Sequence, residues 1–567
     1  MMPAADQFTP LGRPTVTSRV RRRLASSGRF VQGLSRSLIM LVATALVAGC
    51  GKREAAADRA AREGVLLQSL GVMELELDPQ RATQISEGTV LRALFEGLVT
   101  PDPKTLEPRP GVAARWDVSD DGLTYTFFLR ANARWSNGDP VTAQDFADSI
   151  RRVLTPELGA PNVYLVLPLR GARAFHEKRT ADFAQVGAEV IDPHTLRLTL
   201  EQPTPHFLAT LMHFVWLPVH LASIRAAGGE TALNNPWTAP EHIVSNGPFR
   251  LVEYRRQQFL RLEANPLYWD AGAVHLHGIK YFAVGSVEVE ERNFRAGQLH
   301  ITDALPIGKI RSYQENRPQV LHVTPSFALY FYRLNVARPP LNDVRVRRAL
   351  SAAIDRQALV RGPLANAHTP AHAFTPPGAG GYDAPALAVD DPEQARRWLA
   401  EAGFPGGQGM PHLEILYNKS ENHQLVAEIV QDNWRRNLGF EARLANQEIN
   451  VFLANRSTLN YDVCRASWFG DYLDPLAFLE ILTSGNANNQ TGWSNPEYDR
   501  IVAEAARTMD ATRRLALYRD AETILLQEMP VIPLYVQSTI RLVDPRVTGW
   551  FDNPMDLHPQ KYLGFAP

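Results

Sequence analysis

Helical and strand patterns alternate along this sequence, and the alternation limits the possible fold classes more than any other feature. Between residues 342 and 360 the apolar side chains have the i, i+3, i+4, i+7, i+8 spacing of a helix that packs on one face: Val346, Ala349, Leu350, Ala353 and Ile354. Asn342 or Asp343 can cap this helix. A second helix is expected to end at Gly403, and residues 412–418 (HLEILYN) alternate like a strand. Helix and strand in repeated order predict α/β lobes.

The first half of the chain has the same mixture. Strands are predicted within residues 64–78, before Asp-Pro, and over 121–130 and 194–200. Residues 141–154 are predicted to form a helix, because Thr142 can cap it and Asp145 follows three positions later. With 567 residues, the chain is too long for a single core, so two or three domains are expected.

The N-terminus differs in composition from the rest. Residues 1–49 contain seven arginines, one aspartate and the 11-residue apolar run 38–48, which is too short for a permanent membrane helix of ~20 residues and is typical of a signal peptide. The run ends in LVAGC, which resembles the lipobox of bacterial lipoproteins. We therefore expect cleavage before Cys50, a lipid on this cysteine, and a polar tether over residues 50–63.

This leader also bears on location and partners. Its removal changes the formal net charge from −1 to about −7, which does not indicate a nucleic-acid surface. With Cys50 lipidated, Cys464 has no partner for a disulfide. We expect a monomer in the periplasm or cell envelope, anchored to the membrane by its lipid.

Four common catalytic or metal-binding motifs are absent from residues 50–567. The nucleophile elbow, the phosphate-binding loop, the His-Glu-x-x-His zinc motif and the dinucleotide-binding glycine motif do not occur. We predict no catalytic residues, no metal and no cofactor. An exported hydrolase is the enzymatic alternative.

One short stretch indicates a ligand. RASWFGDYLDP (465–475) places a cation, an indole and two carboxylates close together. A zwitterionic ligand such as a short peptide needs a carboxylate for its ammonium group and a cation for its own carboxylate. The alternative is an Arg465–Asp471 surface pair beside core aromatic residues.

Three longer blocks carry a family resemblance. Residues 110–146, 243–270 (IVSNGPF through NPLYWD) and 340–356 (PLNDVRVRRALSAAIDR) resemble, in this order, conserved segments of the solute-binding proteins of peptide ABC transporters, extracellular solute-binding protein family 5. The resemblance implies a bilobal α/β binding-protein fold of the cluster C type. Lobe I would comprise 64–86, 209–330 and 537–567, an extra domain 87–208, and lobe II 331–536, with the ligand between the lobes.

Residues 413–489 resemble the family's ligand-pocket segments, and the resemblance implies a role for each matching position. Asp471 would bind the peptide ammonium, and Arg465 and His423 would approach its carboxylate. The backbone of Ser467 to Phe469 would pair with the extended ligand from one side. The remaining implied contacts are Trp468 as a pocket wall, Arg456 and Asn489 in the lining, and Met73 to Leu75 as the opposite strand.

The expected function is that of a lipid-anchored protein that captures short peptides and delivers them to the permease of an ABC importer. Ile449 stands where a well-known family member has tryptophan, so one side-chain pocket differs. The alternative function on the same fold is binding of a dedicated ligand such as a murein peptide, a nickel complex, haem or an oligosaccharide. A chaperone or sensor partner without a transport role is a further alternative.

Overall fold

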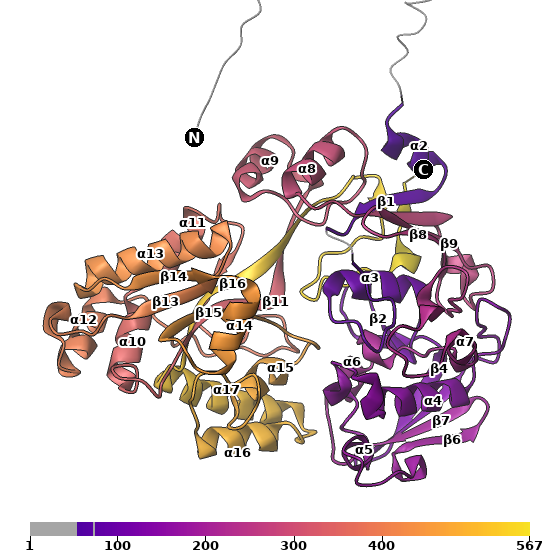
Figure 1. The fold of residues 1–567 in the computed structure, drawn as a ribbon, viewed down its shortest axis with the longest axis horizontal. Helices are drawn as coiled ribbons and strands as arrows, with labels where there is room; N and C mark the ends of the chain where they lie inside the picture. Colours follow the sequence, from indigo (N-terminus) through magenta and orange to yellow (C-terminus); the bar gives the residue numbers. More distant parts are fainter. Residues whose placement is uncertain (1–53, 72–73, 567) are drawn as a thin grey trace, which may run out of the picture. The chain divides into compact units, whose positions relative to one another are not determined.

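The computed structural model describes residues 54–71 and 74–566, and residues 55–567 form one unit (Figure 1). The predicted signal peptide, the lipidation site Cys50 and the predicted ligand contact Met73 lie outside the described residues. Among the helices that are described, none has the length and apolar character needed to cross a membrane.

The first sheet is built from both ends of the N-terminal half. Its order is β1 (Val65–Ser69), β10 (Gly278–Phe282), β9 (Phe259–Ala264) and β8 (Phe249–Arg255); β1 runs parallel to β10 and the other pairs are antiparallel. Strand β1 is shorter than the apolar alternation indicates. It ends at Ser69, and Gly71 then adopts a φ of 73° that favours glycine. Leu75 therefore lies outside any strand.

The described part of the predicted tether forms a helix that packs on the body of the protein. Helix α2 spans Ala56–Arg62 and buries Ala57 and Ala60. The Ala57 amide donates to the Gly297 carbonyl at 2.8 Å, and Asp58 forms an ion pair with Arg546 at 2.8 Å. Alanine-rich sequence has a high helix propensity, and here two small side chains fit against the body.

A second, antiparallel sheet has the order β4 (Ala113–Val118), β5 (Thr124–Leu129), β7 (Thr195–Thr199), β6 (Ala188–Asp192). The strands predicted over 121–130 and 194–200 are confirmed as β5 and β7. Helix α4 (Ala143–Leu154) follows, and its predicted capping box is confirmed, because the Thr142 amide donates to Asp145 Oδ2 at 2.7 Å. Other elements of this half are α3 (Ile85–Leu94), β2 (Val99–Pro101), β3 (Pro108–Pro110), α5 (Ala172–His176), α6 (Phe207–Thr210), α7 (Leu221–Ala227), α8 (Val287–Arg295) and α9 (Ile310–Asn316).

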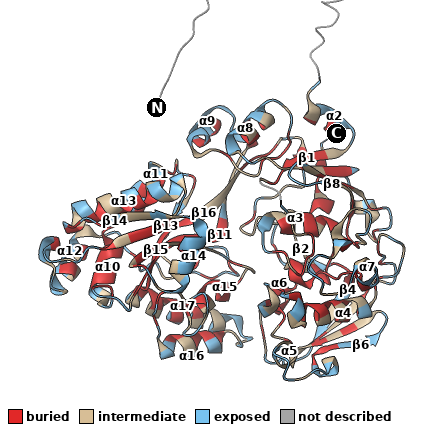
Figure 2. Ribbon diagram, viewed as in Figure 1, coloured by how far each residue is buried: buried red, intermediate tan, exposed pale blue. Residues whose placement is uncertain are grey.

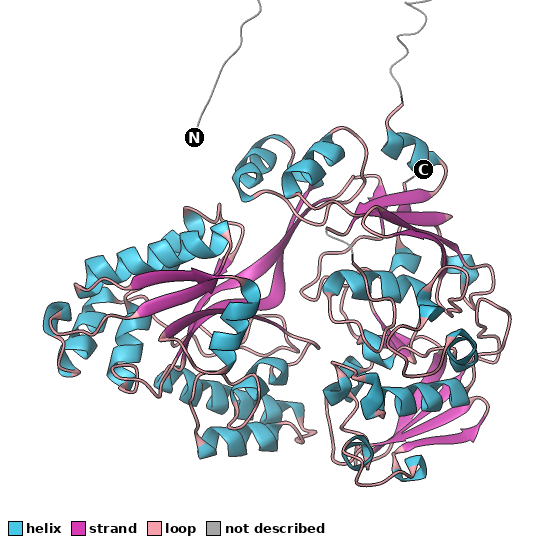
Figure 3. Cartoon of the chain, viewed as in Figure 1, coloured by secondary structure: helices cyan, strands magenta, loops and turns pink. Residues whose placement is uncertain are grey.

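The third sheet has six strands in the order β12 (Thr369–Pro370), β16 (Val531–Leu542), β11 (Leu321–Leu334), β15 (Val463–Phe469), β13 (Glu414–Asn418), β14 (Arg443–Gln447). Strands β11 and β16 are the long central pair, with a register shift between Pro325 and Leu329. Both faces of β13 are covered, because Ile415 packs in the core that contains Trp434 of α13 (Glu421–Leu438), and Leu416 packs with Phe452 of α14 (Ile449–Ser457). Figure 3 shows helices on both sides of these strands.

The helix predicted from residue 342 is split in two. Asp343 caps α10 (Val344–Ala352), and the Asp355 carboxylate caps α11 (Arg356–Arg361) by accepting from the Ala358 amide at 2.7 Å. The apolar spacing continues to Ile354, between the two helices, because residues of both helices and of their connection pack in one core. The remaining helices of this half are α12 (Pro392–Glu401), α15 (Leu476–Leu479), α16 (Pro496–Ala505) and α17 (Ala511–Glu528).

The C-terminal segment returns to the start of the chain. Its short hairpin pairs β17 (Val547–Thr548) with β18 (Gly564–Phe565). Gln560 Nε2 donates to the Thr89 carbonyl at 3.0 Å, and Lys561 lies 3.5 Å from Glu96 in a buried ion pair. Buried residues follow the central strands and the inner helix faces (Figure 2). Residues far apart in sequence thus complete one core.

Candidate functional site

Strand β15 offers a free backbone edge. Strand β11 pairs with the whole of β15, from Val463 to Phe469, whereas β13 pairs only with Val463 and Cys464. Within the described residues, no strand pairs with the other edge of residues 465–469. Unpaired backbone groups on a strand edge can take an extended peptide as an additional strand.

A tight turn positions the carboxylate that follows the strand. The Gly470 amide donates to the Phe327 carbonyl at 3.0 Å, and a Cβ at this position would lie 2.3 Å from the Phe327 ring. Only glycine therefore fits here, and the next residue, Asp471, leaves the sheet at the end of the free edge.

Asp471 is a partly buried carboxylate without a cationic partner among the described residues. Its Oδ2 accepts a hydrogen bond of 2.6 Å from the Tyr164 hydroxyl. Burial raises the pKa of Asp471, and the Tyr164 hydrogen bond opposes that shift only in part. The alternative in which Arg465 pairs with Asp471 is wrong, because no such ion pair is formed. The carboxylate is available to a cation from outside the protein.

A cavity of about 160 Å³ opens beside this carboxylate. It is far larger than the ~10–15 Å³ that one water molecule requires. Both halves of the chain contribute to its walls, which include Phe469, Gly470, Asp471, Arg92, Asn162 and His213.

Arg465 and His423 are brought together at the other end of the free edge. The Arg465 guanidinium lies over the Tyr330 ring, 5.5 Å from its centre, and its Nη2 donates to Ser467 Oγ at 3.3 Å. The Tyr330 hydroxyl and His423 Nδ1 are hydrogen-bonded at 3.2 Å. Burial, reinforced by Arg465, lowers the pKa of His423 to about 4. His423 is therefore neutral near pH 7, and Arg465 carries the charge.

Two more arginines add to this cationic end, Arg456 on α14 and Arg333 on β11. Burial, together with repulsion from Arg456 and Arg465, lowers the pKa of Arg333 to about 10. None of the three arginines has an ion-pair partner among the described residues. Sequence patterns did not indicate Arg333, since it lies inside a buried strand 132 positions before Arg465.

Trp468 and Asn489 are held by contacts within the protein. Trp468 Nε1 donates to the Ala477 carbonyl at 2.8 Å. The Asn489 amide donates to three carbonyls of its own loop, those of Leu482, Thr483 and Trp493. The Asn489 side chain thus shapes the loop, and its predicted place in the pocket lining stays a prediction.

The remaining candidate residues lie in different surroundings. Phe469 is 48% exposed and Ile449, the first residue of α14, is 43% exposed. The Leu75 amide donates to the Tyr254 hydroxyl at 3.3 Å rather than to a strand. No cluster of three or more metal-ligating side chains occurs within the described ranges.

Sequence and structure comparisons agree on one group of proteins. The sequence model described as bacterial extracellular solute-binding proteins, family 5 middle, matches residues 107–490. The periplasmic murein peptide-binding protein MppA of Escherichia coli is 35% identical over 491 residues, 85% of this chain and 89% of the relative. The periplasmic oligopeptide-binding protein OppA of Escherichia coli is 33% identical over 511 residues, 88% of this chain and 91% of the relative. A solved structure of the Escherichia coli murein tripeptide binding protein MppA aligns with a TM-score of 0.76 at 33% identity, covering 88% of this chain and 98% of that one.

Proposed function

Because the chain belongs to family 5 of the bacterial extracellular solute-binding proteins, we propose that it captures short peptides outside the cytoplasmic membrane and delivers them to an ABC importer. The membership confirms the resemblance and the mixed α/β binding-protein fold expected from the sequence. The family comprises solute-binding proteins, which supports binding rather than catalysis as the role of the site.

The observation that carries the proposal is a backbone edge with opposite charges at its two ends. Residues 465–469 of β15 lack a second strand partner; Arg465, the first of them, has no anionic partner, and Asp471, which follows them, has no cationic partner among the described residues. A peptide bound along this edge places its ammonium group at Asp471 and its carboxylate towards Arg465. Main-chain hydrogen bonds then supply affinity that does not depend on the side chains of the peptide.

The geometry also limits ligand length. Four residue steps separate Arg465 from Phe469, a rise of ~13 Å at ~3.3 Å per residue. An extended peptide of about three to five residues spans this distance with its two ends at the charged groups. Arg456 and Arg333 can accept the carboxylate of a longer ligand or a second anionic group.

The rest of the proposal concerns how the protein works in the envelope. Lipid on Cys50 anchors the protein to a membrane. The ligand binds between the lobes defined above, where it contacts the backbone of Ser467 to Phe469 and the side chain of Trp468. Closure of the lobes over the ligand produces the form that the permease recognises, since a ligand favours the conformation that it binds more tightly. The protein acts as a monomer.

Native mass spectrometry of the purified protein tests the proposal. Added masses equal to those of tri- to pentapeptides are expected on the protein as isolated from cells. A protein without added mass that also ignores a mixed peptide library would contradict the proposal.

A murein peptide is the second candidate ligand. It is favoured by the group of three unpaired arginines, Arg333, Arg456 and Arg465, because a murein peptide carries more carboxylates than an ordinary tripeptide. A single fixed added mass would support this dedicated ligand, whereas a ladder of masses would support a broad peptide binder.

A further inference from the structure

Arg92 is a partly buried cation without a hydrogen-bonding or ion-pair partner in the part of the chain that the structure describes. It lies in α3, and within the described residues its guanidinium forms no hydrogen bond and no ion pair. Its nearest aromatic contact is the Phe214 ring, whose centre is 5.9 Å away. A Cβ at Gly88 would come within 2.8 Å of its Nη1, so glycine at this position leaves space for the guanidinium.

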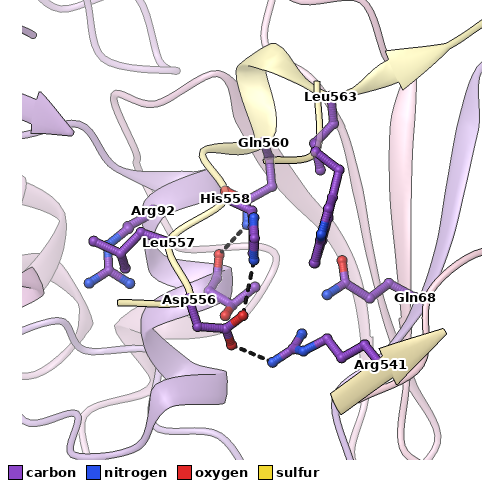
Figure 4. Close-up of a pocket in the computed structure, with 10 residues that line it drawn as sticks. Gln68, Arg92, Arg541, Asp556, Leu557, His558, Gln560 and Leu563 are labelled. Carbon is purple, nitrogen blue, oxygen red and sulfur yellow. Dashed lines mark hydrogen bonds and ion pairs between the residues drawn. The ribbon is translucent and has the colours of Figure 1, made fainter. Parts of the chain in front are cut away.

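The carboxylate whose charge acts on Arg92, that of Asp556, is occupied by other groups. Asp556 Oδ2 accepts from Arg541 Nη2 at 2.5 Å, and Asp556 Oδ1 is hydrogen-bonded to His558 Nε2 at 3.0 Å. Figure 4 shows that Arg92 points away from this group. Burial lowers the pKa of Arg92 to about 10 although the Asp556 charge opposes the shift. A partly buried charge with a buried, unpartnered Nε is stabilised when an anion reaches it.

Arg92 lines the same cavity as Asp471. His213, also in that wall, contributes no charge, because burial and Arg92 lower its pKa to about 3. The cavity thus combines one unpaired carboxylate with one unpaired guanidinium. A ligand whose ammonium group binds Asp471 brings its first residues next to Arg92.

We propose that Arg92 binds a second carboxylate of the ligand, carried on its first or second residue, and thereby makes the protein selective for acidic peptides. This inference rests on the proposed function. The same chemistry has two sources, an ordinary peptide with an acidic side chain near its N-terminus and a murein peptide, whose γ-linked glutamate leaves its α-carboxylate free.

Isothermal titration calorimetry with paired ligands tests the proposal. One pair is Ala-Glu-Lys and Ala-Gln-Lys, and the other is Ala-γ-D-Glu-Lys and its α-amide. Each pair differs by one carboxylate, so the ratio of affinities isolates its contribution. The proteins are the parent, Arg92→Gln and Arg92→Lys, each freed of bound ligand and checked by thermal unfolding.

The parent is expected to bind the acidic member of at least one pair about ten- to a hundredfold more tightly, as for a hydrogen-bonded ion pair. Arg92→Gln is expected to lose this ratio and to bind the amide member within about threefold of the parent, while Arg92→Lys retains part of it. The pair that shows the ratio identifies the source of the carboxylate.

Equal affinities for both members of both pairs on the parent would overturn the inference while leaving the proposed function intact. A ratio that persists in Arg92→Gln would overturn the role of Arg92. Binding of none of the four ligands would overturn the proposed function and the inference together. If Arg92→Gln does not fold, the comparison of the parent with Arg92→Lys still tests the role of Arg92, because an affinity ratio that is unchanged in Arg92→Lys would contradict it.

Discussion

Replacing Asp471 with asparagine tests the ammonium site without changing its shape. Asparagine keeps an oxygen that can accept the 2.6 Å hydrogen bond from Tyr164, so only the charge is removed. Breaking a buried ion pair costs ~3–5 kcal/mol. We expect about 3 kcal/mol, the lower end, because the amide oxygen still accepts a hydrogen bond from the ligand. The dissociation constant of a tripeptide then rises roughly 150-fold.

The pH dependence of binding gives a second readout. Burial raises the pKa of Asp471 in the free protein, and the protonated carboxyl cannot pair with an ammonium group. Peptide affinity of the parent should therefore fall as the pH drops through this raised pKa, whereas the asparagine variant should lack that component. Calorimetric titration of tri-alanine between pH 4 and pH 7 measures both effects.

The stability of the protein without ligand changes with pH in the opposite direction to its peptide affinity. A carboxyl with a raised folded-state pKa binds its proton more tightly in the folded than in the unfolded state, so the free energy of unfolding falls as the pH rises through that range. Asp471→Asn should accordingly be at least as stable as the parent at pH 7 without ligand.

N-acetylated tri-alanine is the matched ligand control for the binding experiment, since it should bind both proteins equally weakly. An asparagine variant that binds tri-alanine as tightly as the parent would refute the ammonium site.

Three further predictions follow from single side chains. Burial raises the pKa of Glu480 to about 7, so the free energy of unfolding should fall by about 3 kcal/mol between pH 4.5 and pH 7. Measured by urea unfolding, this free energy should depend less on pH in Glu480→Gln. The same pH dependence in the variant and the parent would contradict the raised pKa of Glu480. Glu522 accepts hydrogen bonds from two backbone amides and from the Tyr382 hydroxyl. Glu522→Ala should therefore lower the free energy of unfolding, measured in urea, by about 3 kcal/mol or more, because three donors lose their acceptor. Glu522→Gln is the milder control. Arg465→Gln should lower the affinity for peptides with a free C-terminal carboxylate about ten- to a hundredfold, as measured by calorimetry. Its affinity for C-terminally amidated peptides should stay within about threefold of the parent's. Equal losses of affinity for both kinds of peptide would contradict the role of Arg465 in binding the carboxylate.

Local patterns predicted the elements better than their ends. The cap at Thr142 and the strands over 121–130 and 194–200 are confirmed, because each depends on neighbouring residues. The first strand is too long in the prediction, since alternation continues past Ser69 while the backbone turns at Gly71. Helix α2 was missed because alanines next to charged residues resemble a flexible linker in composition, and their burial depends on residues some 240 positions away.

The candidate site could be predicted only where its residues lie in one segment. Residues 465–471 are contiguous, so their charges were visible together in the sequence. Tyr164 lies 307 positions from Asp471, and Arg92 occurs in an ordinary amphipathic helix, so no local pattern connects either residue with the cavity. Asn489 illustrates the opposite case, since its position suggested a ligand contact while its amide bonds the carbonyls of its own loop.

The return of the C-terminal segment has a consequence for how the chain acquires its structure. The hydrogen bond from Gln560 to Thr89 joins residues 471 positions apart, and the ion pair from Arg546 to Asp58 joins residues 488 positions apart. The packing around α2 and α3 therefore cannot be completed until the C-terminal segment has been synthesised, unlike that of a domain that is continuous in sequence. Contacts of such long sequence separation also slow folding, since the intervening chain must be ordered first. The native contacts of α2 and α3 thus depend on residues 546–560, which are among the last to be added to the chain.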